Sequence, residues 1–257
     1  EELKSGLLRL TLNNSQSKNA LSGDMISALI NSIDSASNDH SIKVIIISAS
    51  GNVFCAGHDL KEITEARDSQ DGGDIYFKGL FDSCSSLMQL IINTPKPIIA
   101  QVDGVSTAAG CQLVASCDLA IASDVSKFAT PGVNIGLFCS TPMVALSRNV
   151  HKKNAMEMLL TGDMIDCKKA KEIGLINEYV SPDNLSDSVL HLAEKIASKS
   201  SRTLATGKKA FYKQAEMSLA DAYEYTSEVM KENLLRSDAK EGINAFLEKR
   251  TPKWDDE

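Results

Sequence analysis

Residues 102–113 read Val102-Asp103-Gly104-Val105-Ser106-Thr107-Ala108-Ala109-Gly110-Cys111-Gln112-Leu113. They continue from an apolar segment, Pro97–Val102, that is typical of a buried strand, and they lead into a helical pattern. Small side chains in the turn between them leave the backbone N–H groups of the helix start uncovered. Such groups can hold a developing negative charge. The stretch therefore predicts an anion-stabilising pocket at the start of a helix.

Gln112 falls on the first turn of that predicted helix, beside the expected pocket. A hydrating or hydrolytic enzyme needs a carboxylate at such a place, because it must exchange a proton with its substrate. An amide can orient a water molecule or a carbonyl, but it does not exchange a proton at neutral pH. We therefore expect a pocket that polarises a carbonyl group and lacks its proton-transfer group.

A second loop, Phe54–Glu62, lies upstream of this stretch. Gly57 permits a tight turn and a close approach to a ligand, after which the backbone N–H of His58 can point into the site. Taken alone, the loop is a strand-to-helix turn with Asp59 as a helix cap. Together with the Ala108–Gly110 turn it supplies a second donor, as polarisation of a thioester carbonyl requires. Each such donor contributes about 2.7–4 kcal/mol to transition-state stabilisation.

Strand and helix patterns alternate through the first two-thirds of the chain. Leu7–Leu12 alternates apolar and polar residues, as a half-buried strand does, and Val44–Ile47 is typical of a strand covered on both faces. A helix is expected around Met25–Ile33 with Ser22 as its cap. Two further short strands are expected at residues 119–122 and 127–129. This order predicts an α/β core with right-handed crossovers.

The character of the chain changes after residue 184. Four helical patterns follow without an intervening strand, at residues 185–197, 204–215, 219–235 and 239–249. We therefore divide the chain into a core, residues 1–184, and a helical C-terminal region, residues 185–257. This region is either a cap on the core or an oligomerisation module. We favour the second interpretation, because short helices with apolar faces rarely stand alone.

Composition excludes several classes of function. A net charge of −7 and a pI near 5.2 argue against nonspecific nucleic-acid binding and against a basic membrane-binding face. The four histidines show no i, i+4 pairing that would indicate a metal site, and no apolar run approaches the length of a membrane span. The six cysteines form no C-x-x-C pair, so we expect free, buried thiols.

Several motifs together resemble the enoyl-CoA hydratase/isomerase, or crotonase, superfamily over essentially the whole chain. They are Ala56-Gly57-His58-Asp59, residues 104–118, and Phe128-Ala129-Thr130-Pro131-Gly132 through Leu137, with Glu241–Arg250 similar to the closing helix of the family. The resemblance implies a spiral of ββα units and a trimer or dimer of trimers built by the C-terminal helices. It also implies an acyl-CoA thioester as ligand, with no cofactor besides the coenzyme A of the substrate.

The resemblance assigns roles to both turns. The two oxyanion-hole N–H groups would belong to His58 and Ala109. The acyl-CoA would lie against Cys55, Ala56, Gly57, Asp59, Leu60, Lys61 and Gly110. Lys61 is then a candidate neighbour of a phosphate or the ribose.

Three departures from the family pattern bear on mechanism. Hydratases of the family carry a glutamate three residues beyond the second donor, where this chain has Gln112, and another after the proline that follows the Phe128 strand, where it has Gly132. Dienoyl isomerases and hydrolases of the family use a further carboxylate a few residues later. We place the corresponding position at residue 140, where this chain has Ser140. Each proton-transfer group usually contributes about 10²–10⁴ in rate. We therefore expect thioester binding with little or no hydratase activity.

Some alternatives stay open at this point. The His58 side chain could act as a base, or its backbone alone could matter. A family decarboxylase has a turn similar to Ala56–Asp59, and decarboxylation needs enolate stabilisation but no general base. We favour use of the His58 backbone alone. Cys111 and Cys139 flank the presumed pocket, and packing is favoured over a nucleophilic role. Asn134 either points inward or only ends a strand.

The sequence leaves three functions to compare. The chain is an acyl-CoA-binding protein of fatty-acid metabolism, an active decarboxylase or hydrolase that uses His58, or a regulatory partner that hetero-oligomerises through residues 185–257. By resemblance we expect a mitochondrial protein, and the missing N-terminus is compatible with a removed transit peptide.

Overall fold

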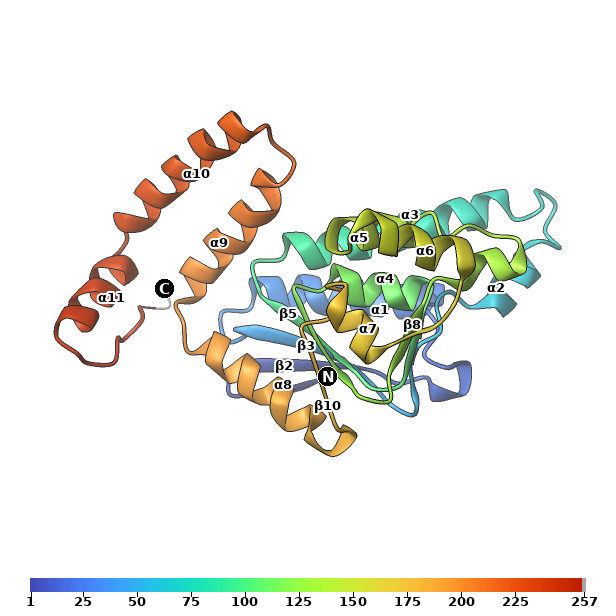
Figure 1. Cartoon of the computed structure of the whole chain (residues 1–257), viewed down its shortest axis with the longest axis horizontal. Coiled ribbons are helices and arrows are strands. Elements are labelled where there is room, and N and C mark those ends of the chain that lie inside the picture. Colours follow the sequence, from blue (N-terminus) through green and yellow to red (C-terminus); the bar gives the residue numbers. More distant parts are fainter. Residues whose placement is uncertain (256–257) are drawn as a thin grey trace.

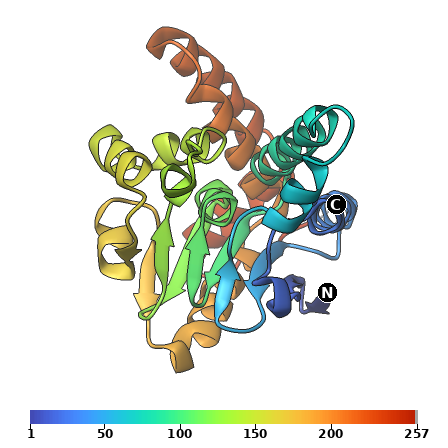
Figure 2. The ribbon, with the colours of Figure 1, turned by 90° about the vertical axis from the view of Figure 1, so that its right-hand side faces the viewer.

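The computed structural model describes residues 1–255, which form two sheets of unequal size flanked by helices (Figures 1 and 2). The larger sheet has the order β1-β2-β3-β5-β7-β10. Its strands are β1 (Glu2–Lys4), β2 (Leu7–Leu12), β3 (Val44–Ala49), β5 (Ile98–Val102), β7 (Leu119–Ser123) and β10 (Glu178–Val180). The smaller sheet contains, in order, β4 (Val53–Cys55), β6 (Val105–Thr107), β8 (Lys127–Ala129) and β9 (Ile165–Asp166).

Successive strands enter the two sheets in turn. The chain passes from β3 to β4, from β5 to β6 and from β7 to β8, and it places the first strand of each pair in the larger sheet and the second in the smaller one. Helices follow each pair. Within each sheet these strands are parallel, while β1 and β9 pair antiparallel at the edges. This arrangement confirms the predicted α/β spiral of ββα units.

The helices follow in chain order between and after the strands. They are α1 (Gly23–Asn38), α2 (Leu60–Ala66), α3 (Asp74–Asn93), α4 (Ala109–Ser116), α5 (Pro142–Asn149), α6 (Lys152–Thr161), α7 (Cys167–Glu172), α8 (Pro182–Ala197), α9 (Ser201–Gln214), α10 (Leu219–Leu234) and α11 (Ser237–Leu247), with 3-10 turns η1 (Ser15–Ser17) and η2 (Pro131–Ile135). Within residues 1–255, none of them is long and apolar enough to cross a membrane.

Strand β3 explains how the larger sheet is buried on both faces. Because side chains alternate along a strand, Val44 and Ile46 point to one face and Ile45 and Ile47 to the other. The first pair packs in a cluster with residues of α8, and the second pair joins the main core with α1, α3 and α4. All four side chains are buried, as the β-branched run predicts.

Two helix starts follow the predicted capping chemistry. The Ser22 side chain accepts a hydrogen bond from the Met25 backbone N–H at 3.2 Å and begins α1. Asp59 accepts from the Lys61 N–H at 2.8 Å and begins α2. Such caps stabilise a helix by about 1 kcal/mol each. The local interpretation of Asp59 as a cap is therefore confirmed.

Five short strands were not predicted, namely β1, β4, β6, β9 and β10. Residues 105–107, expected within a turn, form β6, and residues 53–55 form β4. Val105 pairs with Val53 on one side and with Lys127 of β8 on the other. Strands of three residues are too short to display a period in the sequence, so they are set by their pairing partners. Helix α9 also begins earlier than predicted, at Ser201, with Ser200 as its cap.

The C-terminal helices divide into one that covers the sheet and three that extend from it. Helix α8 packs against the larger sheet, whereas α9, α10 and α11 extend away from the body as an arm (Figure 1). Lys208 holds α9 to the body, because its Nζ contacts Asp118 Oδ2 at 2.6 Å and donates to the carbonyl oxygens of Ile91 and Lys96. Tyr212 donates a further hydrogen bond to Asp118 at 2.9 Å.

Candidate functional site

The turns that follow β4 and β6 lie in contact, because these strands are parallel neighbours and their carboxyl ends share one edge of the smaller sheet. Gly57 has a φ of +96°, and a Cβ placed on it would lie 2.9 Å from Ala108 Cβ and 3.4 Å from Ala109 N. A side chain at residue 57 would therefore be strained in its backbone and would push the two turns apart.

Gly110 makes a second close approach between the two segments, because it lies against the backbone of Cys55 at the end of β4. A Cβ on Gly110 would lie 2.3 Å from Cys55 O and 2.9 Å from Cys55 C, both backbone atoms. The Thr107 hydroxyl donates to Ala56 O at 3.0 Å and ties the two segments together. The two glycines thus let backbone meet backbone where side chains would normally keep the segments apart.

Ala108, at the centre of the second turn, has an unusual backbone conformation. Its φ of 50° and ψ of −119° lie in a region that residues with a Cβ rarely adopt. Such a conformation costs about 1–3 kcal/mol and persists where surrounding contacts impose it. Here the Ala108 N–H donates to Ala129 O at 2.9 Å, and Ala108 O accepts from Gln112 N at 3.0 Å as α4 begins.

The backbone N–H groups of His58 and Ala109 remain as donors at the junction of the two turns. Within residues 1–255, no oxygen accepts a hydrogen bond from either of them, and both residues line one cavity. Ala109 is the first residue of α4, where the helix dipole adds partial positive charge. Two such donors could stabilise an oxygen that gains negative charge.

The cavity has a volume of about 650 Å³ and a mainly apolar wall. The residues that line it are Ala56, His58, Leu60, Ile63, Phe81, Ala108, Ala109, Pro131, Gly132, Asn134, Ile135, Gly136, Leu137, Phe138, Cys139, Ser140, Thr141 and Pro142. In the part of the chain that the structure describes, no Asp or Glu contributes to this wall. The site can thus receive an apolar group, and its wall offers no carboxylate for proton transfer.

His58 is held in one tautomer by its surroundings. Its Nδ1 lies 3.2 Å from Leu21 O, and because a carbonyl only accepts, Nδ1 carries the proton. Burial lowers the pKa of His58, so the ring is neutral and Nε2 keeps a lone pair. Nε2 is buried with no hydrogen-bond partner among the described residues, and the ring meets Phe81 edge-on at 5.5 Å between centroids.

Gln112 lies inside the protein rather than on the cavity wall. Its exposed fraction is 4%, and its Oε1 accepts a hydrogen bond from Cys84 Sγ of α3 at 3.9 Å. Burial raises the pKa of Cys84 to about 11, so the thiol remains a donor at neutral pH. The amide therefore bonds across to α3 and does not form part of the wall, where the sequence placed it beside the pocket.

Gly132 lines the cavity, and its surroundings leave no room for a side chain. A Cβ there would lie 2.8 Å from Leu137 O and 2.9 Å from Cys139 Sγ. Cys139, Ser140 and Asn134 also line the cavity, so Asn134 belongs to the site and does not merely end a strand.

The cysteine predictions agree with the structure. Cys111 is buried in α4 and does not line the cavity, and burial raises its pKa to about 12. Burial also raises the pKa of Cys139, whose thiol does line the cavity. All six cysteines are free and buried, as predicted.

The predicted site residues thus fall into two groups. Ala56, His58, Leu60, Ala109 and Gly132 line the cavity. The others lie outside its wall: Cys55, Gly57 and Gly110 form the contact between the turns, Asp59 caps α2, Lys61 is exposed on α2, and Gln112 is buried behind α4.

Sequence reasoning missed the apolar part of the wall. Ile63 of α2, Phe81 of α3, and Leu137 and Phe138 after η2 all line the cavity. Phe81 lies in helix α3, but periodicity does not reveal which cavity a helix faces. Only the packing of α2 and α3 beside the two turns brings these side chains to the site.

Comparisons with known proteins cover nearly the whole chain. The family described as Enoyl-CoA hydratase/isomerase matches residues 2–257. Enoyl-CoA hydratase domain-containing protein 3, mitochondrial, of Xenopus laevis is 50% identical over 249 residues, which are 97% of this chain and 83% of that protein. The Homo sapiens protein of the same name is 50% identical over 254 residues, 98% of this chain and 82% of that protein.

Solved structures agree with the sequence matches. The crystal structure of human enoyl Coenzyme A hydratase domain-containing protein 3 superposes with a TM-score of 0.94 at 47% identity and covers 98% of both chains. An enoyl-CoA hydratase of Mycobacterium smegmatis superposes with a TM-score of 0.94 at 45% identity and covers 99% of this chain and 97% of its own.

Proposed function

Because this chain belongs to the enoyl-CoA hydratase/isomerase family, we propose that it binds acyl-CoA thioesters in the 650 Å³ cavity and has little or no enoyl-CoA hydratase activity. The thioester carbonyl oxygen accepts hydrogen bonds from the N–H groups of His58 and Ala109. The acyl chain lies against the apolar wall. We further propose that coenzyme A enters only as part of this ligand and that no other cofactor takes part.

The pair of backbone donors is the observation that carries this proposal. The Gly57 and Gly110 contacts bring the two turns together, and both N–H groups lie at the wall of an apolar cavity. In a site that excludes water, such donors act more strongly on a carbonyl than they would in solution.

The proposed lack of hydratase activity rests on the two glutamate positions. By resemblance they fall at Gln112 and Gly132, and neither residue exchanges a proton at neutral pH. The Gln112 amide is engaged with Cys84, and the space beside Gly132 is filled by Cys139 Sγ and Leu137 O. A water molecule in the cavity would then lack the carboxylate base with which family hydratases activate it to attack an enoyl group.

Two measurements on the same protein test this proposal. Calorimetric titration with crotonyl-CoA and with longer acyl-CoA thioesters should detect binding, while hydration of crotonyl-CoA, followed by loss of its ultraviolet absorbance, should stay close to the uncatalysed rate. Hydration at the rate of an ordinary family hydratase would refute the loss of activity. Absence of binding to every thioester would refute the ligand class.

A second candidate function is favoured by the state of His58. Its neutral ring with a lone pair on Nε2 could accept a proton from the attacking water in hydrolysis of an unusual acyl-CoA. Decarboxylation would need no base, because the two backbone donors would stabilise the enolate that is left when CO2 departs. Mass spectrometry of a panel of acyl-CoA thioesters after incubation would reveal turnover. Turnover that disappears in His58→Gln supports this function, and turnover that is unchanged in His58→Gln counts against the histidine.

We propose a homotrimer or a dimer of trimers assembled through residues 185–257. The arm of α9, α10 and α11 exposes large apolar side chains, among them Phe211 at 64%, Leu219 at 77% and Phe246 at 83%. Exposed apolar surface of this kind usually marks an interface. Light scattering tests the assembly, and a stable complex with a different protein would instead support the regulatory partner.

We also propose a role in mitochondrial fatty-acid metabolism, since the similar Xenopus laevis and human proteins are named as mitochondrial. Imaging of the tagged protein in cells tests this location.

A further inference from the structure

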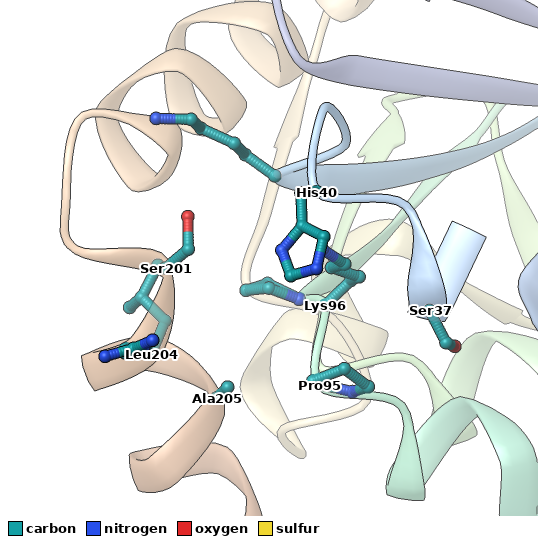
Figure 3. A pocket seen from close by; sticks show the side chains of 10 residues that line it. Ser37, His40, Pro95, Lys96, Ser201, Leu204 and Ala205 are labelled. Carbon is teal, nitrogen blue, oxygen red and sulfur yellow. The ribbon is translucent and has the colours of Figure 1, made fainter. Parts of the chain in front are cut away.

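The 650 Å³ cavity contains a thiol that the proposed binding of a thioester does not use. Cys139 lines this cavity, although the residue is only 7% exposed. A second cavity, of about 190 Å³, lies between the end of α1 and the start of α9 (Figure 3). Among the described residues, its wall contains no cysteine and shares no residue with the larger cavity. The thiol therefore belongs to the cavity that contains His58 and Ala109.

The Cys139 thiol lacks the acceptor that other buried thiols have. Cys84 Sγ donates to Gln112 Oε1 at 3.9 Å, and Cys167 Sγ donates to Asp124 O at 3.1 Å. Within residues 1–255, no oxygen accepts a hydrogen bond from Cys139. Its S–H group is therefore not engaged by the protein, and a reactive molecule in the cavity meets it directly.

The fold places this sulfur near the two backbone donors. A Cβ on Gly132 would lie 2.9 Å from Cys139 Sγ, so the sulfur occupies the space that a side chain at residue 132 would take. Ala129 O accepts from Ala108 N at 2.9 Å, and Gly132 follows Ala129 by three residues. Three residues span at most about 10 Å. The sulfur and the Ala109 N–H thus border the same part of the cavity.

An α,β-unsaturated thioester carries an electrophilic carbon close to its carbonyl group. Its C3 is separated from the carbonyl oxygen by only two carbon atoms. Hydrogen bonds from the His58 and Ala109 N–H groups to that oxygen would draw electrons from C3 and stabilise the enolate that forms when a nucleophile adds there. Cysteine is intrinsically very nucleophilic, and its sulfur suits such a carbon. A saturated thioester has no electrophilic carbon at this position.

We propose that Cys139 adds covalently to C3 of an α,β-unsaturated acyl-CoA, an inference that rests on the proposed binding of acyl-CoA in this cavity. The Sγ–C3 bond forms while the C2=C3 π bond breaks, and the π electron pair moves to the thioester oxygen as an enolate. The proton that leaves the thiol is taken up at C2, which restores the carbonyl group. The product is a thioether that keeps its CoA thioester, and the step needs no oxidant, reductant or further reactant.

The environment of the sulfur sets the rate of this addition. Burial raises the pKa of Cys139, while a hydrogen bond from the Gly132 backbone to the sulfur partly opposes this change. Because the thiolate is the attacking form, the addition is slow at neutral pH. Each chain has one such sulfur, so loss of the enoyl absorbance should stop at one equivalent of ligand. Catalysed hydration would instead continue past that point.

The test is incubation of the full chain with crotonyl-CoA for several hours, followed by intact mass measurement and peptide mapping by tandem mass spectrometry. We expect the chain to gain the mass of one whole crotonyl-CoA, on the peptide that contains Cys139. Butyryl-CoA, the saturated counterpart, should bind in calorimetric titration and add no mass.

Two variants separate Cys139 from the other thiols. Cys139→Ser should lose the adduct, because a serine hydroxyl is a much weaker nucleophile towards such a carbon. The matched control is Cys167→Ser, which should keep it. Cys167 is also buried but lies outside the cavity wall, and a serine hydroxyl there can still donate to Asp124 O.

The outcomes distinguish this inference from the proposed function. Binding of butyryl-CoA without any adduct of crotonyl-CoA would overturn the inference and leave the proposed function standing, whereas absence of binding to both thioesters would overturn both. An adduct that persists in Cys139→Ser, or a gain of the crotonyl group alone, would also overturn the inference, since the smaller mass marks acyl transfer to sulfur with release of coenzyme A. Peptide mapping of the unaltered protein decides the matter if Cys139→Ser does not fold.

Discussion

The contact between Gly110 and Cys55 provides a sharp test of how the two turns form the site. In Gly110→Ala, the new Cβ would lie 2.3 Å from Cys55 O and 2.8 Å from Cys55 Cβ. Backbone atoms cannot rotate away as the end of a long side chain can. Helix α4 and the turn after β4 must therefore separate.

The size of the effect follows from this overlap. Forcing extra volume into a packed interior costs about 1–3 kcal/mol of unfolding free energy. Relief of the overlap needs a movement of about 1 Å, and a displacement of that size in a site can lower a rate about 10²-fold. For ground-state binding, loss of both N–H contacts should weaken thioester binding roughly 5- to 150-fold, since each net hydrogen bond contributes roughly 0.5–1.5 kcal/mol.

Gly79→Ala is the matched control. Gly79 is an exposed residue within α3, and a Cβ there would meet no atom within 4 Å. This change should stabilise the protein by about 0.5–1 kcal/mol, because alanine favours a helix over glycine. Urea unfolding and calorimetric titration with crotonyl-CoA measure both variants. Equal stability and equal affinity in Gly110→Ala and Gly79→Ala would show that the close approach of the two turns does not form the site.

The remaining predictions concern the arm, His58 and the thiols. Lys208→Met should lower the unfolding free energy by about 3–5 kcal/mol, because it leaves the Asp118 carboxylate, whose side chain is only 16% exposed, without its cation; a loss below about 1 kcal/mol in urea unfolding would contradict this. Since burial lowers the pKa of His58 below 6.5, the unfolded chain binds more protons in the window between the folded pKa and 6.5. Stability should therefore fall as the pH drops through that window, and His58→Gln should flatten this dependence in urea unfolding; an unchanged slope would argue against a buried neutral ring. The pKa is raised by burial to about 12 for Cys55, about 11 for Cys84 and about 12 for Cys111, so Ellman's reagent should label the folded protein slowly at pH ~8 and all six thiols after denaturation. Rapid labelling of the folded protein would contradict their burial.

Much of the framework could be predicted because it depends on local chemistry. The β-branched run at Val44–Ile47 indicates a strand that is buried on both faces. Ser22 and Asp59 belong to the residue types whose side chains cap helices. The spacing of apolar residues also predicts the succession of helices after residue 184. Each of these features requires only residues close together in the sequence.

The short strands and the apolar wall of the site could not be predicted in this way. Strands β4 and β6 have three residues each, and their existence depends on pairing between segments tens of residues apart. The same long-range pairing decides that Phe81 lines the cavity while Gln112 turns towards Cys84. Periodicity indicates that a side chain is buried but not which neighbour it meets.

The sequence by itself determined the α/β spiral, the two glycine-containing turns and the residues at their tips. Tertiary structure alone decided that Gly57 lies against Ala108, that Gly110 lies against Cys55, and that the sulfur of Cys139 lies beside Gly132. The physical reason is the separation along the sequence between the residues that interact. Caps, turns and burial periods act over a few residues, whereas contacts between distant segments depend on how both sheets and all their helices pack at once.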